Sequence, residues 1–342
     1  MSEVWPVGSV ISMGALRVRV EGELASTHEE LWSRRRWAEP GTGVAAESQT
    51  AGVGRGGARW ESPQGGLYVS VLAGAGMRAA DADALGEAAS LAVLQVASEV
   101  APGVELFLKW PNDVVARLPR ERVGKVAGVI VRAESDAERV LRAVVSVGVN
   151  LEAAVERVPG APGPTVPASL EGLARRAGGP WAASRVQALE WMVGFLALDL
   201  ERARVDPPAV RARYGAELRR SPLRARVAGV REAFRPLGVA PGGALLVRRE
   251  SGRTAEVGVA DAERLEWRWL REAGGRKRGA PGRRKAPTKR GGAKRAGAER
   301  SGAKRGGADR KRKPPRGGRA AAGGLKRSAA RAPRAARRAA RR

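Results

Sequence analysis

The stretch ELFLKWPNDV (105–114) is the most specific string in this chain. Its first half is short and apolar, which predicts a strand, and Pro111 ends that strand because proline cannot donate to a sheet ladder. The segment after it places Lys109, Asn112 and Asp113 at the strand exit, where Asp113 offers a carboxylate suited to a metal ion or a ribose. The alternative is a Pro-Asn-Asp turn without a functional role.

The regions around this string alternate between helical and extended patterns. Ser26 and Glu29 form a capping box that predicts a helix over 26–37, and the Ala/Leu-rich stretch 81–100 predicts an amphipathic helix. Further helices are expected at about 181–205 and 208–218, after a Pro/Gly connector at 158–168. Strands are expected at 15–24, 42–48, 67–74, 125–134 and 139–152, the last two as a hairpin.

This order of elements predicts an α+β fold, a mixed sheet flanked by helices. From about residue 222 to 270 the pattern changes to short strands separated by turns, RARVAGV, GALLVRR, TAEVGVA and LEWRW. Some fifty residues of this kind are enough for a small β-barrel. The interpretation divides the chain into a main domain (1–218), a small β domain (219–270) and a tail (271–342).

The tail carries nearly all of the net charge of +28. From Ala273 onward there are 27 Lys and Arg residues against two acidic ones, whereas residues 1–272 hold 36 basic and 33 acidic residues. All nine Trp, three Phe and both Tyr precede the tail, which contains a tandem decad, GGAKRAGAER (291–300) and SGAKRGGADR (301–310). A segment with so little to bury is expected to be disordered.

Several classes of protein are excluded by composition. The chain has no cysteine, which rules out thiolate catalysis, Cys-ligated zinc and disulfides, and fits a cytoplasmic location. No apolar stretch approaches membrane-spanning length, and no secretion signal is evident at the N-terminus. We therefore expect no membrane association.

A glycine loop follows the strand expected at 42–48. Its hexapeptide GVGRGG (52–57) fits the dinucleotide fingerprint G-x-G-x-x-G, but a strand rather than a helix follows it, so the dinucleotide interpretation fails on context. What remains is a long, flexible, basic loop that could close over an anion, because glycines allow close backbone approach and arginines supply bidentate donors. A mobile surface loop is the alternative.

Five motifs in order give the chain a resemblance to biotin protein ligases. They are STH (26–28), GVGRGGARW (52–60), KWPND (109–113), KVAGV (125–129) and SVGVN (146–150). They match the family strings S-T-N, G-R-G-R-x-G-R-x-W, K-W-P-N-D, K-x-x-G-[IV] and G-x-G-x-N. The resemblance spans about residues 15–270 and implies a ligase catalytic domain followed by a small SH3-like barrel, without the N-terminal DNA-binding domain of repressor-type members.

The resemblance implies a two-step reaction. Biotin is activated by ATP, with Mg²⁺ on the phosphates, to biotinyl-5′-AMP, and a lysine of a biotin carboxyl carrier protein, typically that of acetyl-CoA carboxylase, then attacks the mixed anhydride. Arg55, Lys109 and Lys125 would stabilise the anions that meet in the first step. No protein-bound metal is expected.

The resemblance also assigns binding residues by position. The biotin site would comprise Ser26, Thr27, His28, Gln49, Val53, Gly54, Arg55 and Lys125, with GGLYVS (65–70) as a wall. The nucleotide site would comprise Arg59, Trp60, Asn112, Asp113 and Asn150, with Trp60 packing against the adenine side. Residues 49–60 would cover the adenylate and exclude water from it.

The chain departs from the family strings at four positions. His28 replaces Asn, Val53 and Ala58 replace two loop arginines, and Ser146 replaces a glycine. Because the loop loses two cations, weaker attraction for the phosphates is expected, although Arg59 could stand in for the residue lost at 58. A lone histidine at a helix start is more commonly a structural residue than a catalyst.

Two other interpretations compete with that of a biotin protein ligase. Lipoate ligases share the fold, but the chain lacks their Arg-Arg and triple-Gly strings and a His-Asp pair in the matching loop. The tail, by contrast, favours nonspecific nucleic-acid binding through residues 271–342 by counterion release, with the ligase-like core weak or vestigial. A solvated tail without a role is the alternative to that hypothesis.

Overall fold

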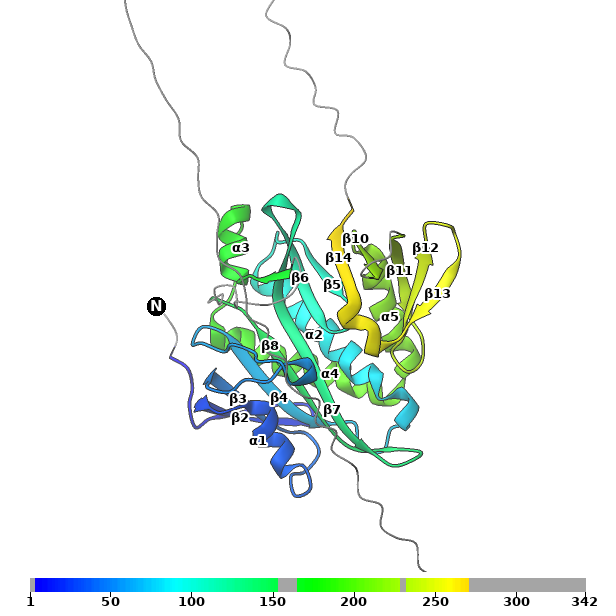
Figure 1. Ribbon diagram of the computed structural model, residues 1–342. Coiled ribbons are helices and arrows are strands. Elements are labelled where there is room, and N and C mark those ends of the chain that lie inside the picture. Colours follow the sequence, from blue (N-terminus) through cyan, green and yellow to red (C-terminus); the bar gives the residue numbers. More distant parts are fainter. Residues whose placement is uncertain (1–3, 153–164, 228–231, 271–342) are drawn as a thin grey trace, which may run out of the picture. The chain divides into compact units, whose positions relative to one another are not determined.

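A nine-stranded mixed sheet forms the larger part of the structure, a computed structural model that describes residues 4–152, 165–227 and 232–270 (Figure 1). All of these residues lie in one compact unit, 1–276. The strand order is β1-β2-β3-β4-β8-β7-β6-β5, and β9 pairs with β7. The strands are β1 Val10–Met13, β2 Leu16–Leu24, β3 Thr42–Gln49, β4 Leu67–Ala73, β5 Leu106–Lys109, β6 Asp113–Leu118, β7 Arg122–Ser135, β8 Val140–Val149 and β9 Thr165–Pro167.

Most neighbours in this sheet are antiparallel, and β2–β3 and β7–β9 are parallel. Side chains alternate between the two faces, as the strand period requires. On β4, Val69 and Val71 enter the main core, whereas Leu72 packs with Leu31 in a second cluster. The sheet is therefore covered on both faces.

Helices α2 (Asp83–Val100) and α4 (Arg185–Val205) cover the main-core face, and α1 (Thr27–Arg34) covers the other (Figure 1). The Oγ of Ser26 caps α1 by accepting from the backbone N–H of Glu29 at 3.4 Å. The remaining helices are α3 Leu170–Ala177 and α5 Pro207–Arg220, with short 3₁₀ turns η1 Arg55–Gly57, η2 Ala79–Asp81, η3 Pro119–Glu121 and η4 Val259–Arg264.

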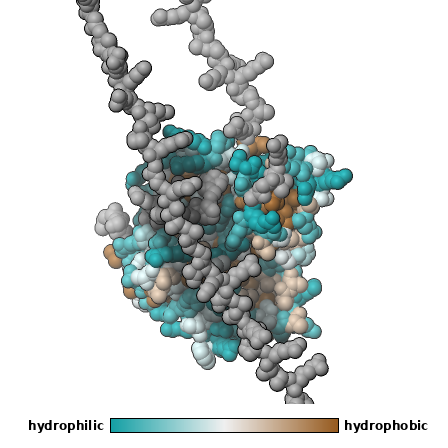
Figure 2. Space-filling view, in the orientation of Figure 1, coloured by the Kyte–Doolittle hydropathy of each residue, from teal (hydrophilic) through white to brown (hydrophobic). Residues whose placement is uncertain are grey.

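The later strands form a separate five-stranded sheet in the order β13-β12-β11-β10-β14. Trp269 of this sheet donates from Nε1 to the carbonyl of Arg122 on β7 at 2.9 Å, and Trp110 donates to Gly243 O at 3.0 Å. Hydrophobic residues gather over this sheet on an otherwise largely hydrophilic face (Figure 2). Its strands are β10 Leu223–Val227, β11 Phe234–Val239, β12 Leu245–Arg249, β13 Thr254–Val257 and β14 Leu265–Trp269.

The mixed sheet, the flanking helices and the separate C-terminal sheet confirm the predicted fold class. The hairpin of β7 and β8 is also confirmed. The sequence interpretation missed β1, β6, β11 and α3, and residues 165–167, expected in a connector, pair with β7 as β9. The expected helix at 26–37 ends at Arg34.

The predicted tail at 271–342 lies outside the described residues, as does part of the predicted connector, residues 158–164. Within the ranges that are described, no helix is both long and apolar enough to cross a membrane.

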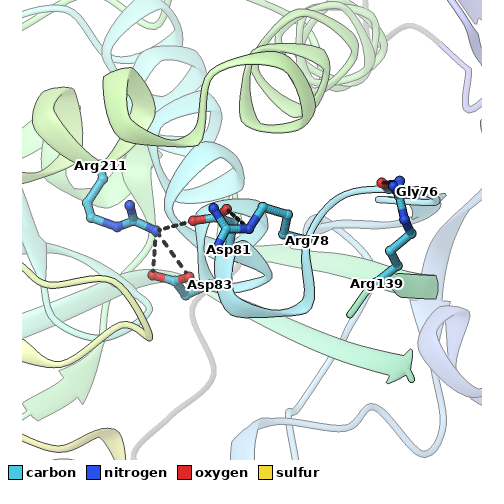
Figure 3. A network of polar contacts seen from close by, with 6 residues as sticks. All are labelled: Gly76, Arg78, Asp81, Asp83, Arg139 and Arg211. Carbon is cyan, nitrogen blue, oxygen red and sulfur yellow. Dashed lines mark hydrogen bonds and ion pairs between the residues drawn. The ribbon is translucent and has the colours of Figure 1, made fainter. Parts of the chain in front are cut away.

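Arg211 of α5 holds the start of α2 in place (Figure 3). Its Nη2 lies 3.4 Å from Asp81 Oδ1 and 3.3 Å from Asp83 Oδ2, and Arg78 pairs with Asp81. Glu87 lies one turn further along α2 and is 5 % exposed. Burial and the charge of Asp83 raise the pKa of Glu87 to about 8, although Arg211 opposes the shift.

This carboxyl predicts a pH-dependent loss of stability. Because the pKa of Glu87 is about 8 in the folded protein and near 4.5 otherwise, the folded state holds a proton that the unfolded chain releases between these values. Stability should therefore fall as pH rises from about 5 to 8.5. Glu87→Gln should remove this component, so that the variant gains about 2 kcal/mol or more over the parent across that range. Urea denaturation of the parent and of Glu87→Gln at the two ends of this pH range measures the difference in the free energy of unfolding. The same pH dependence of stability in both proteins would contradict the prediction.

Candidate functional site

A cavity of about 760 Å³ lies where the loop after β3, the exit of β5, and strands β7 and β8 meet. Strand β9 and the segment Ala262–Trp267 close another side of it. The individual residues that the sequence assigned to catalysis and binding line this one cavity: Ser26, Thr27, His28, Gln49, Val53, Gly54, Arg55, Arg59, Trp60, Lys109, Asn112, Asp113, Lys125 and Asn150. Residues more than a hundred positions apart thus converge.

A β-bulge turns Lys125 toward the cavity. Strict alternation along β7 would place Lys125 on the face opposite Gly128, yet both residues line the cavity. The register accounts for this, because Val114 pairs with Ala127 whereas Val115 pairs with Lys125, which leaves Val126 as an extra residue. Bulges of this kind re-aim side chains next to functional sites.

Asp113 ties two lysines together at the base of the cavity. Its Oδ2 lies 2.6 Å from Lys109 Nζ, and its Oδ1 lies 2.6 Å from Lys125 Nζ. Burial alone would raise the pKa of the Asp113 carboxyl, but the two ammonium groups outweigh burial and hold it well below its usual range. The carboxylate is therefore charged at neutral pH and fixes both cations.

The structure pairs Asp113 with lysines, whereas its residue type suggested a metal or ribose ligand. Each of its oxygens lies within ion-pair distance of an ammonium group. No group of three or more His, Asp and Glu residues suited to a metal occurs among the residues that the structure describes.

Trp60 lies flat on a pair of glycines. Gly128 and Gly148 face each other across β7 and β8. A methyl group at Gly148 would lie 2.7 Å from Trp60 Nε1, and one at Gly128 would lie 3.3 Å from Trp60 Cζ3. Lys125 Nζ is 5.1 Å from the centre of the indole ring, within cation–π range. The two glycines thus leave the space that the indole ring occupies beside Lys125, because a side chain at either position would crowd the ring.

The glycine loop is folded back on itself rather than extended. Val53 forms a bridge with Arg59, and Trp60 N–H donates to Gly52 O at 2.9 Å. Arg55 Nη2 lies 3.6 Å from Glu263 Oε1 on η4, so the loop contacts the second sheet's segment. Arg59 is largely exposed and pairs with Glu61 at 2.7 Å.

A chain of hydroxyl and amide groups forms a hydroxyl-rich part of the cavity lining. Gln49 Oε1 accepts from the backbone N–H of Thr27 at 2.8 Å, and Gln49 Nε2 donates to Ser62 Oγ at 2.8 Å. Behind them, Ser70 on β4 bonds to Thr27 Oγ1 at 2.9 Å. None of the segment 65–70, predicted as a cavity wall, lines the cavity itself, because Ser70 is covered by Thr27 and Ser146.

The two asparagines brace β7. Asn112 Nδ2 donates to Val129 O at 2.7 Å, and Asn150 Nδ2 donates to Lys125 O at 3.2 Å. Each amide nitrogen is thus used by the protein backbone. Asn150 in particular holds the bulged residue that carries the cavity's lysine.

Sequence reasoning missed two sides of the cavity. One is β9 (165–167), which lies inside a Pro/Gly-rich run, and the other is the segment from Ala262 to Trp267. One further feature of the sequence distinguishes the two lysines from the other basic residues. Lys109 and Lys125 are the only lysines in residues 1–276, where every other basic side chain apart from His28 is arginine.

Comparison with known proteins shows what this region is similar to. Residues 22–150 match the model of the Biotin/lipoate A/B protein ligase family. We refer to this part of the chain as the ligase domain, after the model that it matches. The resemblance read from the five motifs is confirmed, since those motifs lie between residues 26 and 150.

Two curated relatives of the ligase domain are biotin–[acetyl-CoA-carboxylase] ligases. The one from Paracoccus denitrificans is 34% identical over 132 residues, which are 38% of this chain and 52% of that protein. The one from Mycobacterium tuberculosis is 34% identical over 154 residues, 42% of this chain and 53% of that protein. The chain thus spans about half the length of these relatives.

The ligase domain also has a counterpart among solved structures. The biotin protein ligase from Aquifex aeolicus, in complex with biotin and ATP, aligns with a TM-score of 0.52 and 21% identity over 74% of this chain and 98% of that chain. This likeness shows a shared fold. The nucleic-acid hypothesis rests on residues 271–342, outside the described ranges, and these matches give it no support.

Removal of the shared carboxylate tests the lysine arrangement. Asp113→Asn leaves two ammonium groups close together without their counter-charge, so we expect a loss of about 2–4 kcal/mol in the free energy of unfolding. Asp261→Asn is the matched control, because it breaks the exposed pair with Arg264 and should cost less than about 1 kcal/mol. Urea denaturation measures both, and equal losses would contradict the buried ion-pair interpretation.

Proposed function

We propose that this chain is a biotin protein ligase that activates biotin with ATP to biotinyl-5′-AMP. The observation that carries the proposal is the convergence of all five motifs on one cavity, whose lining contains two cations and a hydroxyl-rich part. A carboxylate with a neutral polar ring system suits such a cavity. The family of residues 22–150 supports the same conclusion.

In the first step the biotin carboxylate attacks the α-phosphate of ATP, and pyrophosphate leaves. Two anions must meet, so fixed cations are required. Lys125 and Lys109 would supply them, because Asp113 holds both in place before substrate arrives. Arg55 would add a third charge from the loop. Mg²⁺ would enter with the ATP phosphates as part of the substrate, since Asp113 is occupied by lysines.

The biotin ring would lie at the hydroxyl-rich part of the lining, near Ser26, Thr27 and Gln49. The nucleotide would lie near Asn112 and Asn150, with Trp60 beside it. The folded loop 52–60 would cover the mixed anhydride and keep water away from it. These placements rest on the family strings and on the fact that all of these residues line the cavity.

In the second step a lysine amine of an acceptor protein attacks the mixed anhydride, and AMP leaves. The acceptor we propose is a biotin carboxyl carrier protein of acetyl-CoA carboxylase, after the names of the two relatives. A cytoplasmic location is part of the same proposal. We further propose that residues 1–218 are the catalytic domain, 219–270 an SH3-like domain and 271–342 a separate tail.

Biotin-dependent pyrophosphate release tests the first step. The full-length protein with ATP, Mg²⁺ and biotin should release pyrophosphate, whereas lipoate and octanoate should not support release. Lys125→Ala should lower the rate at least about a hundredfold, because it removes a fixed charge from the reacting phosphate. Release that is independent of biotin, or a Lys125→Ala variant with near-normal rate, would contradict the proposal.

The loop can be tested by restoring a cation. Val53 lines the cavity where the family string has arginine, so Val53→Arg should hold the adenylate phosphate more tightly and slow its escape several-fold. Release of biotinyl-5′-AMP from preloaded protein, measured after dilution, gives the rate. Val205→Arg, at the exposed last residue of α4 and outside the cavity lining, controls for added charge in general. Equal escape rates in the parent and Val53→Arg would show that the missing loop charge is unimportant.

A further inference from the structure

The two departures from the family strings that lie deepest in the protein touch each other. His28 on α1 and Ser146 on β8 are both more than nine-tenths buried, and His28 Nδ1 lies 2.8 Å from Ser146 Oγ. Ser146 in turn lies 2.7 Å from Ser70 Oγ. The chain of contacts continues from Ser70 to Thr27 and from Thr27 to Gln49.

The direction of this chain is fixed at its far end. Gln49 Oε1 faces the backbone N–H of Thr27, which can only donate, so this atom is an acceptor. Gln49 Nε2 faces Ser62 Oγ, whose own proton goes to the carbonyl of Trp60 at 3.1 Å. The amide orientation therefore satisfies both neighbours, and Thr27 Oγ1 must donate to Gln49 Oε1 at 3.1 Å.

Counting protons then settles the form of the histidine. The four side-chain contacts from Gln49 to His28 need one proton each, and the hydroxyls of Thr27, Ser70 and Ser146 supply three. The fourth must come from His28 Nδ1–H, which donates to Ser146 Oγ. Neutral His28 consequently carries its lone pair on Nε2.

His28 Nε2 faces open space. His28 lines the 760 Å³ cavity and also an adjoining cavity of about 470 Å³. None of the described residues forms a hydrogen bond with His28 Nε2. The atom is also not one of the fully buried polar atoms that lack a partner, so it is accessible from the cavity. An acceptor that the protein has oriented but not used is thus presented to whatever occupies the cavity.

We propose that His28 is a specificity-determining residue whose Nε2 accepts a hydrogen bond from a ring N–H of the bound ligand. The inference rests on the proposed function, under which the ligand is biotin and the donor is an N–H of its cyclic urea. Thr27 and Gln49 would reach the same ring from the other side of the chain. Acids without an N–H, such as lipoate and octanoate, offer nothing to this acceptor and leave it unpaired, which disfavours them.

The charges around His28 keep the acceptor available at neutral pH. Burial lowers the pKa of the imidazole; Glu29 on α1 opposes this and Arg132 on β7 adds to it. Arg55 of the loop and Asp83 and Glu87 of α2 line the smaller cavity with it. Because the pKa is lowered, protonation comes only below the ordinary value of 6.5, and it converts Nε2 from an acceptor into a donor.

The first experiment is nitrogen NMR of the full-length protein, whose single histidine makes the signal unambiguous. At pH 8 the protein should show the Nδ1–H form, and saturating biotin should shift the Nε2 resonance toward that of a hydrogen-bonded acceptor. A predominant Nε2–H form would overturn the proposal. So would an Nε2 resonance that biotin leaves unchanged.

The second experiment is biotin binding by calorimetry over a pH series that runs downward from pH 8, with the nitrogen spectrum of His28 recorded at each pH. The parent should bind about tenfold or more weakly where the spectrum shows a protonated imidazole, because a buried acceptor is then replaced by a donor facing an N–H. His28→Asn should lose most of this pH dependence, since the amide does not titrate there. Undiminished biotin binding by the parent with a protonated His28 would overturn the proposal.

The measurements distinguish a failure of the role of His28 from a failure of the proposed function. Biotin-dependent pyrophosphate release with an unmoved Nε2 signal would reject the role of His28 and leave the ligase proposal intact. A protein that neither binds biotin nor releases pyrophosphate would reject both.

Discussion

The site depends on one buried carboxylate. Asp113 lies between the only two lysines of the first 276 residues and holds both ammonium groups within 2.6 Å of its oxygens. Without this carboxylate, two ammonium groups could not be kept close together in a partly buried place, because their like charges would repel each other. The exit of β5, the turn at Pro111 and the bulge in β7 all serve to bring these three side chains to one point.

Another part of the cavity lining is organised by hydrogen bonds rather than by charge. A directed chain runs from His28 through three hydroxyls to Gln49, and each donor in it has one acceptor. Such a network fixes the positions of its members, because reversing one bond would leave another contact without a proton. The cavity thus offers both fixed cations and oriented neutral groups, and Trp60 and its loop contribute to the same lining.

The sequence predicted more of the site than of the boundaries of its elements. The site residues assigned from the motifs include many that line the cavity, although not Trp110, Gly128 or Gly148, and the hydrophobic alternation predicted the β7–β8 hairpin. Strand β9 could not be predicted, because three residues within a Pro/Gly-rich run are too few to show the alternation of polar and apolar side chains that is typical of a strand. Strand β11 was hidden because Pro236 and Gly238 interrupt its pattern, and the structure has a register shift there.

The sequence by itself determined which residue types are available: a Lys-Trp-Pro-Asn-Asp strand exit, a glycine-rich loop with arginine, and a single histidine beside a helix cap. Only the tertiary structure decided what they do. Asp113 pairs with Lys125 because the bulge in β7 brings that lysine onto its face, and His28 presents Nε2 as an acceptor because its single ring proton, on Nδ1, is donated to Ser146, 118 positions away. Both outcomes depend on contacts between different elements of the fold, which local patterns do not encode.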